Sequence, residues 1–552
     1  MGNKNKLKRR IDKNLGMKKN IFLIIFNIAL IVGILNIFHV IIGFAKTPSG
    51  QVYLATGHYY LDYFEYYLQP VSQGARGSWL YERFDLERPV KTIFGAWQNV
   101  MIGKSGAFFG LSAVASYWIS IVIFSIIFCL LIYLAITKLL AKESFLKQFL
   151  AYIIALFAAP FFKIAVISGK IKFFTFHFWN DKAVIYDRFG GVPYHISSSI
   201  LMLLVLIIVG DSLEKLEKVS KKRLFLNTTI VITILVFLLT FSPESFFLLV
   251  ASIGFLFAGL TIYYFLKKRK FLPRLIFFLG IPLIIVIPIG FWVKNYLVNY
   301  LYAGISQMET TWQINPPFID VLLTTGPIII LALFGSIKFF RQITPLKLIF
   351  TIFVTVSYGV FFSPLNRYLG TTNTRFLTSI NYVFFGALAV SGIKKTKLLL
   401  VITTILFLLF LPANIEGLKT KLNDSNLFSP ITYLPKGIID GFKQLEATGE
   451  TKVVLTTPAQ FLGTIVPIYT GKRVYISRPG QSNYYQKAYL ADQFYLGLMP
   501  EKEAKYFLLK NNIGYVILTS IEAYPKKNVS KYNFLREIYK NEDIVIFKLV
   551  LI

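Results

Sequence analysis

The residues best suited to chemistry lie in one short stretch, Thr56–Glu87, between the first two long apolar segments. Carboxylates can take a proton from a hydroxyl group, and arginines bind phosphate groups. Lipid excludes such side chains unless they face a cavity, so we expect this stretch outside the bilayer core. Its ionisable residues are His58, Asp62, Glu65, Arg76, Glu82, Arg83, Asp85 and Glu87.

The spacing of this stretch suits transfer of a sugar from a lipid phosphate to a hydroxyl. If Gly57–Leu68 forms a helix, then His58, Asp62 and Glu65 lie on one face. Asp62 is the predicted base, with Glu65 and then Asp85 as substitutes. Arg76 lies between two glycines that end the helix. The alternative for each carboxylate is a solvated loop whose charges simply stay in water.

A second mixed loop, Ser168–Gly191, contains the pair Asp187-Arg188 followed by two glycines. A cation beside a flexible backbone suits a clamp for a phosphate or another substrate group. The competing interpretation is an ordinary ion pair at the start of a helix.

Three further residues occupy predicted membrane boundaries. Glu244 follows Pro243 between two apolar segments, where a carboxylate is costly unless it faces a cavity. Arg367 and Arg375 flank a polar loop, and Arg375 starts a helix where a lipid phosphate would lie. Arginines that extend to lipid headgroups are the alternative. We therefore add His58, Arg76, Asp187, Arg188, Glu244, Arg367 and Arg375 to the candidate substrate-binding residues.

The single cysteine, Cys129, lies in an apolar run, which excludes a disulfide within the chain and a cysteine-based metal site. The four histidines are widely scattered, so a histidine-based metal site is not expected. A carboxylate-bound Mg²⁺ or Mn²⁺ stays open, and its ligands are unknown.

The composition indicates a membrane protein. The 552 residues are 55% hydrophobic and 16% charged, with a mean hydropathy of +0.60, whereas soluble domains carry more charge. Several segments reach the roughly 20 residues that span a bilayer. The formal net charge of +32 arises largely beside apolar segments, which indicates topology and headgroup contact rather than nucleic-acid binding.

Hydropathy predicts about eleven transmembrane helices in residues 21–411, after a basic cytoplasmic tail, 1–20. The basic runs place the N-terminus inside and the first outer loop, residues 45–107, outside. The outer loops Ser242–Glu244 and Asn299–Pro317 contain no Lys or Arg. We expect the eleven helices near residues 21–44, 108–136, 149–167, 192–210, 227–241, 245–266, 275–298, 318–336, 348–362, 376–392 and 398–411.

The composition changes after residue 411. Short β-branched runs alternate with helical patterns, which predicts a small α/β domain over residues 412–552. We expect strands at 452–456, 473–476, 515–518 and 544–549, with helices at 459–469, 501–511 and 534–540. The topology places this domain outside, and the whole chain in the plasma membrane.

The motif Leu61-Asp62-Tyr63-Phe64-Glu65-Tyr66-Tyr67 after the first helix resembles the first outer loop of GT-C superfamily glycosyltransferases. Asn373-Thr374-Arg375-Phe376 with Asn381-Tyr382 is similar to a late arginine-aromatic motif of that group. The resemblance implies a polytopic fold with an extracytoplasmic domain and a donor sugar on a polyprenyl phosphate. It also implies inversion at the sugar, an Asp62 base, phosphate contact by Arg375, and a glycan, lipid or protein acceptor.

The sequence departs from the mannosyltransferase branch, which has adjacent acidic residues where Asp62 and Glu65 are two aromatics apart. It also lacks a WWD acceptor motif. Two alternatives are a flippase or transporter of lipid-linked oligosaccharides and a non-catalytic membrane scaffold. A transporter typically carries ionisable residues in mid-helix and inverted repeats, and neither pattern is evident here.

Overall fold

The computed structural model of the protein describes residues 20–56, 63–84, 90–178, 181–267, 272–424, 432–479, 481 and 483–550. Two compact units divide the chain. The first comprises residues 1–37 and 121–419, and the second comprises residues 38–120 and 420–552. The first outer loop and the C-terminal residues therefore belong to the same unit.

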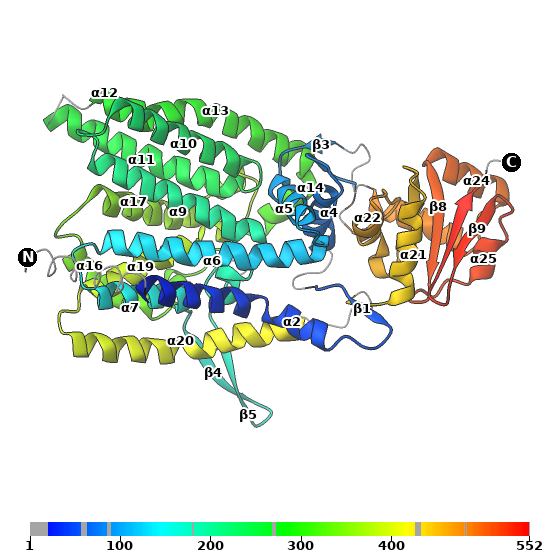
Figure 1. The fold of residues 1–552 in the computed structure, drawn as a ribbon, viewed down its shortest axis with the longest axis horizontal. Helices are drawn as coiled ribbons and strands as arrows, with labels where there is room; N and C mark the ends of the chain where they lie inside the picture. Colours follow the sequence, from blue (N-terminus) through cyan, green and yellow to red (C-terminus); the bar gives the residue numbers. More distant parts are fainter. Residues whose placement is uncertain are drawn as a thin grey trace, which may run out of the picture. The chain divides into compact units, whose positions relative to one another are not determined.

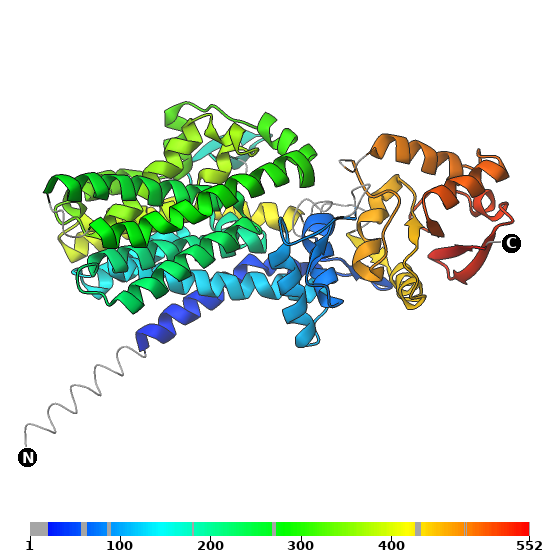
Figure 2. The same ribbon diagram turned by 90° about the horizontal axis from the view of Figure 1, so that it is seen from above.

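The first unit is a bundle of apolar helices (Figures 1 and 2). Long helices run side by side: α17 packs on both α9 and α11, α10 packs on α9, α11 and α13, and α13 also packs on α11. Its helices are α7 (Phe145–Phe157), α8 (Ile185–Phe189), α9 (Pro193–Glu214), α10 (Lys221–Leu239), α11 (Pro243–Lys267), α12 (Leu272–Leu275), η3 (Ile276–Gly280), α13 (Ile281–Tyr296), η4 (Leu297–Leu301), α14 (Ala303–Thr311), α15 (Phe318–Thr325), α16 (Ile328–Phe339), α17 (Pro345–Phe362), α18 (Leu365–Tyr368), η5 (Asn373–Phe376) and α19 (Ser379–Ser391).

Within the described residues, seven helices are long and apolar enough to cross a membrane, and two broken pairs bring the total to nine. One broken pair is Asn20–Asn36 with α2 (Phe38–Ala45), and the other is α15 with α16, bent by 90°. The sequence predicted about eleven spans; at the other two positions the described residues form shorter apolar helices, α7 and α19. Helices α6 (Ala113–Leu139) and α20 (Thr396–Asp424) continue from one unit into the other.

Two predicted helices have other boundaries. The helix expected at 149–167 ends at Phe157, and a hairpin of β4 (Phe162–Ile167) and β5 (Lys170–Thr175) follows. Pro160 lacks the amide hydrogen that would continue the helix, and the β-branched residues after it favour a strand. The last helix, expected to end at 411, extends to Asp424 despite Pro412 within it.

The second unit contains the start and end of the first outer loop. Strand β1 (Gln51–Tyr53) pairs with β6 (Tyr433–Pro435), and β2 (Tyr81–Glu82) pairs with β3 (Lys91–Thr92). A π-helix, η1 (Tyr63–Leu68), continues into α4 (Gln69–Ala75), which packs on α5 (Trp97–Phe108). A Cβ at Gly74 would lie 2.0 Å from the Val100 carbonyl oxygen, so this close packing requires glycine.

The C-terminal domain is α/β, as predicted. Its sheet has the order β7-β8-β10-β9, in which β7 and β8 are parallel and the other pairs antiparallel. The core contains Phe494, Tyr495, Phe507 and Val516. Its elements are α21 (Lys436–Ala447), β7 (Val453–Leu455), η6 (Ala459–Thr464), α22 (Val466–Thr470), α23 (Tyr484–Tyr495), α24 (Glu501–Lys510), β8 (Ile513–Thr519), α25 (Lys526–Ser530), β9 (Leu535–Lys540) and β10 (Ile544–Leu549).

Two elements of this domain differ from the sequence-based prediction. Residues 535–540, expected to be helical, form the edge strand β9 because Leu535–Lys540 pairs with β10. The strand expected at 473–476 is reduced to one bridge between Val474 and Val454. The predicted fold class, a polytopic helical protein with a C-terminal α/β domain, is confirmed.

Candidate functional site

In the second unit, the described part of the acidic first loop is fixed by the C-terminal domain. Glu65 is only 3% exposed, and its Oε2 lies 2.5 Å from Arg478 Nε. The Ser477 hydroxyl donates a second hydrogen bond to Glu65, at 3.2 Å. The guanidinium groups of Arg83 and Arg478 lie near the Tyr66 ring, at 5.6 Å and 4.7 Å from its centre, respectively. Glu65 is thus a buried, charge-paired carboxylate.

Three further contacts hold the first loop on the same domain. Arg76 pairs with Glu446 at 3.0 Å, and Glu82 pairs with Arg473. The Ser72 hydroxyl donates to the carbonyl oxygen of Ile468 at 2.5 Å. The predicted binding residue Arg76 is therefore part of this docking surface, at the C-terminal end of α4.

Three predicted residues of this loop, His58, Asp62 and Asp85, lie outside the described residues. Their roles as substrate contact, base and substitute base stay predictions. The π-helix η1 begins directly after Asp62, at Tyr63. A π-helix is uncommon and frequently marks a functional segment.

In the first unit, Arg375 lies in a cluster of polar side chains that are buried or partly buried. Its Nε donates to Glu309 Oε2 at 2.9 Å, and its Nη2 donates to the other oxygen of the same carboxylate. Its Nη1 donates to the Tyr194 hydroxyl at 2.9 Å. Burial lowers the pKa of Arg375, but Glu309, together with Tyr194 and Glu244, more than offsets this and raises the pKa above its ordinary value. The guanidinium is therefore charged and rigidly oriented.

Glu244 belongs to the same cluster. It begins α11, accepts a hydrogen bond from the Ser242 hydroxyl at 3.0 Å, and interacts electrostatically with Arg375 and Glu309. Thr371 donates to Glu309 at 2.8 Å. Residues from α9, α11, α14 and η5 thus meet around one guanidinium.

Arg188 occupies a different environment from Arg375. It is 1% exposed, and its five N–H groups donate to five backbone carbonyl oxygens, those of Ala155, Leu156, Ala158, Lys182 and Ala183, at 2.7–3.2 Å. The guanidinium carbon lies 3.9 Å from the centre of the Tyr382 ring. A guanidinium has five N–H donors, so this arrangement leaves none for a phosphate.

The two remaining predicted residues are Asp187 and Arg367. Asp187 follows Tyr186 in the short helix α8, and Arg367 is exposed on α18. Asp181, in the same loop as Asp187, is buried and accepts backbone hydrogen bonds from Phe178 and Ala183 at 2.6 and 3.0 Å. Burial raises the pKa of Asp181 above its ordinary value.

Several residues that pair with the predicted site residues were not themselves predicted from the sequence. Glu309 is the only acidic residue in the stretch 299–317, which has no Lys or Arg, and that isolation was a usable signal. Tyr194, Arg473 and Arg478 had no comparable signal, because only the fold brings them to their partners.

A partly buried carboxyl, Glu522, lies in the C-terminal domain beside the ends of β7 and β8. Glu522 accepts hydrogen bonds from the hydroxyls of Thr457 and Thr519. Burial raises its pKa to about 7. Nearby, Gln460 and Phe461 have φ values of 57° and 54°, which residues other than glycine rarely adopt.

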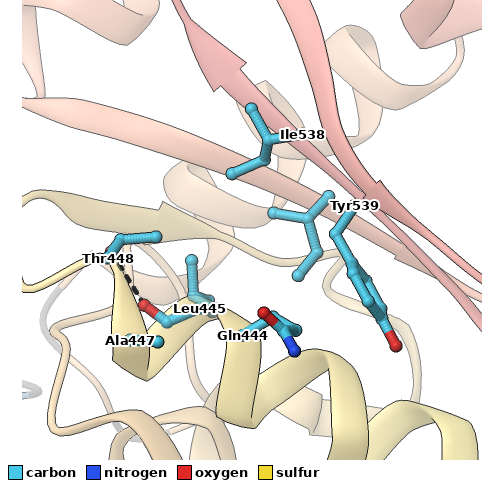
Figure 3. A pocket seen from close by; sticks show the side chains of 7 residues that line it. Gln444, Leu445, Ala447, Thr448, Ile538 and Tyr539 are labelled. Atoms are coloured by element: carbon cyan, nitrogen blue, oxygen red, sulfur yellow. Dashed lines mark hydrogen bonds between the residues drawn. The ribbon is translucent and has the colours of Figure 1, made fainter.

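The C-terminal domain also has a cavity of about 290 Å³ between α21 and the strands β9 and β10 (Figure 3). Its seven described lining residues, Gln444, Leu445, Ala447, Thr448, Ile538, Tyr539 and Ile546, include neither a carboxylate nor a cation. This cavity therefore supplies neither a base nor a phosphate ligand.

The sequence left open whether carboxylates bind a divalent cation such as Mg²⁺ or Mn²⁺. Among the residues that the structure describes, no group of three or more His, Cys, Asp or Glu side chains is arranged to hold a metal ion. The first-loop acids Asp62, Asp85 and Glu87 lie outside these residues, so metal binding by them stays open.

The sequence matches no protein-family model and no curated protein. Solved structures do match. An oligosaccharyltransferase from Archaeoglobus fulgidus, in complex with zinc and sulfate, aligns with a TM-score of 0.50 and 12% identity over 95% of this chain and 73% of that chain. ArnT from Cupriavidus metallidurans, bound to undecaprenyl phosphate, aligns with a TM-score of 0.51 and 10% identity over 96% of this chain and 98% of that chain.

The arabinofuranosyltransferase AftD from Mycobacteria aligns with a TM-score of 0.52 and 10% identity over 96% of this chain, which spans 40% of the length of AftD. These identities are low, so the likeness establishes the fold. The chain shares the fold of these three transferases, and this is the fold that the resemblance in its sequence implied.

Proposed function

We propose that the protein is a membrane glycosyltransferase. It moves a sugar from a polyprenyl-phosphate donor to a hydroxyl of an extracytoplasmic acceptor. The observation that carries this proposal is the fold likeness to ArnT, which extends over nearly the full length of both chains. The ArnT structure contains bound undecaprenyl phosphate. The acidic loop after the first apolar helix supports it, because glycosyl transfer needs a base at the acceptor.

The proposed reaction is a single inverting displacement. The carboxylate of Asp62 accepts the proton of the acceptor hydroxyl while that oxygen bonds to the anomeric carbon. The bond between the anomeric carbon and the phosphate oxygen breaks, and its electron pair leaves with the polyprenyl phosphate. The products are the glycosylated acceptor, protonated Asp62 and free polyprenyl phosphate, which balances atoms and charge.

Arg375 is the proposed ligand of the donor phosphate. Its fork-shaped pairing with Glu309 uses the same geometry that binds a phosphate. We propose that the phosphate competes with Glu309 for this fork and that Tyr194 keeps the guanidinium oriented. Since the carbonyls hold every donor of Arg188, that residue supports the backbone between α7 and α8 in this proposal.

The C-terminal domain positions the acidic loop. Arg478 pairs with Glu65 three residues after Asp62, and Arg76 and Glu82 add two more ion pairs to the domain. A buried pair is costly to break but gives a defined geometry. Glu65 is therefore assigned to holding the loop, and Asp62 keeps the role of base.

The test is transfer by purified Asp62→Asn in detergent or vesicles, with undecaprenyl-phosphate-linked pentose and hexose donors. Release of undecaprenyl phosphate is measured. We expect a rate loss of about 10²- to 10⁴-fold with unchanged expression. The matched control Asp440→Asn alters an exposed acid of α21 and should be fully active.

Full activity of Asp62→Asn would exclude this residue as the base. If the wild-type protein instead moves the intact donor between leaflets and releases no undecaprenyl phosphate, the flippase alternative replaces the transferase.

A further inference from the structure

A small cavity lies where two predicted membrane spans meet the bilayer surface. Helix α9 ends at Glu214 and α10 begins at Lys221, so the turn between them lies at headgroup depth if both helices cross the membrane. The cavity measures about 140 Å³ and is lined by Ile208, Asp211, Ser212, Lys215, Val219, Arg223 and Asn227.

The lining residues come from facing turns of the two helices. Asp211 lies in the last turn of α9, and Lys215 is the residue directly after that helix. Arg223 and Asn227 are four residues apart on α10, so they lie on one face of that helix. The Asn227 amide donates to the Ser212 hydroxyl at 2.8 Å and joins the two helices at the cavity. The site is therefore built into the helix packing.

The cavity carries excess positive charge. Its one carboxylate, Asp211, pairs with Lys138 of α6 at 2.6 Å. Within the described part of the chain, the side chains of Lys215 and Arg223 form no ion pair or hydrogen bond with other side chains. Asp211 with Lys138 is neutral, so Lys215 and Arg223 leave a charge of about +2 at the cavity.

We propose that this cavity binds the phosphate headgroup of an anionic membrane lipid. Basic pockets between transmembrane helices bind such headgroups. Ile208, one turn deeper in α9, and Val219 supply apolar surface beside the polar groups. This position at a membrane boundary favours a lipid over a free phosphate ion. The site is separate from the Arg375 cluster and does not depend on the proposed reaction.

The test uses the full-length protein in neutral detergent, with phosphatidylglycerol binding measured by native mass spectrometry. We expect Lys215→Ala/Arg223→Ala to weaken binding about twentyfold, since each cation contributes roughly a factor of five at a membrane surface. Phosphatidylcholine should bind weakly to both proteins.

The matched control is Lys218→Ala/Lys222→Ala, which removes the same charge from the same exposed segment but leaves the cavity lining intact. It should weaken binding by less than half as much, in logarithmic terms. Equal weakening by the two double variants would show a diffuse basic surface and overturn the proposal. Displacement of the lipid by millimolar inorganic phosphate, at constant ionic strength, would assign the cavity to free phosphate and overturn the lipid assignment.

Discussion

In the first unit Arg188 is buried and Arg375 is partly buried, and the sequence predicted a phosphate role for both. Arg188 donates to five backbone carbonyls, whereas Arg375 donates to the side chains of Glu309 and Tyr194. Backbone carbonyls are fixed by the fold, but side chains can rotate away when a ligand arrives. A buried arginine is therefore a candidate ligand-binding residue when side chains hold it.

The largest expected effect is the loss of Arg188. Replacement by Gln would leave several buried carbonyl oxygens without donors, at a cost of at least about 5 kcal/mol in folding free energy. We expect Arg188→Gln to accumulate poorly and to melt far below the wild type, as measured by membrane expression and thermal unfolding in detergent. A variant that folds normally and loses only lipid-phosphate affinity would contradict the structural role.

The second effect concerns Arg375. Arg375→Gln alone leaves the Glu309 carboxylate buried without its cation, which costs about 3–5 kcal/mol. The double variant Arg375→Gln/Glu309→Gln removes both charges and should regain most of that stability without regaining transfer activity. Thermal unfolding and donor turnover measured on the same samples separate these effects. Recovery of activity in the double variant would exclude Arg375 as the phosphate ligand.

Glu522 extends the contrast to a partly buried carboxyl whose hydrogen-bond partners are two threonine hydroxyls. Its pKa rises from an ordinary 4.5 to about 7 because of burial. Between pH 4.5 and about 7, Glu522 binds more protons in the folded state than in the unfolded state. Its contribution to the free energy of unfolding is therefore most favourable below pH 4.5 and falls as the pH rises through about 7. We expect Glu522→Gln to remove this dependence, worth about 3 kcal/mol, in thermal unfolding at pH 5 and 8. An unchanged pH dependence would show that Glu522 ionises normally.

The smallest effect sharpens the role of Glu309. If Glu309 competes with the donor phosphate for Arg375, then Glu309→Gln removes both a competitor and a repulsive charge. We expect undecaprenyl phosphate to bind roughly tenfold more tightly, a gain of about 1.4 kcal/mol, in a fluorescence competition assay. Tyr194→Phe, which removes only the hydroxyl bonded to Arg375, is the matched control and should change affinity less. Weaker binding by Glu309→Gln would contradict the competition.

The fold was predictable from the sequence because apolar length and charge bias act locally. All eleven apolar segments lie near their expected positions. The strands 453–455, 513–519 and 544–549 are formed by the β-branched runs themselves. The errors arose where tertiary pairing overrode local pattern. Residues 535–540 favour a helix alone but complete a sheet edge next to β10.

The candidate site was predictable only in part. Arg375 and Glu244 were identified by type and position, and they share one cluster. The role suggested for Arg188 ignored five carbonyls that come from two separate segments, since no local pattern reports them. The partner of Glu65 is Arg478, more than 400 residues later, and such a contact has no sequence signal.

The most direct measurement is a cryo-electron microscopy structure of the purified protein with undecaprenyl phosphate bound. We expect phosphate density against the Arg375 guanidinium, with Glu309 displaced from its fork and Arg188 still on its five carbonyls, because the phosphate and Glu309 compete for Arg375 in our proposal. Phosphate density elsewhere, with the Arg375–Glu309 pair intact, would contradict it.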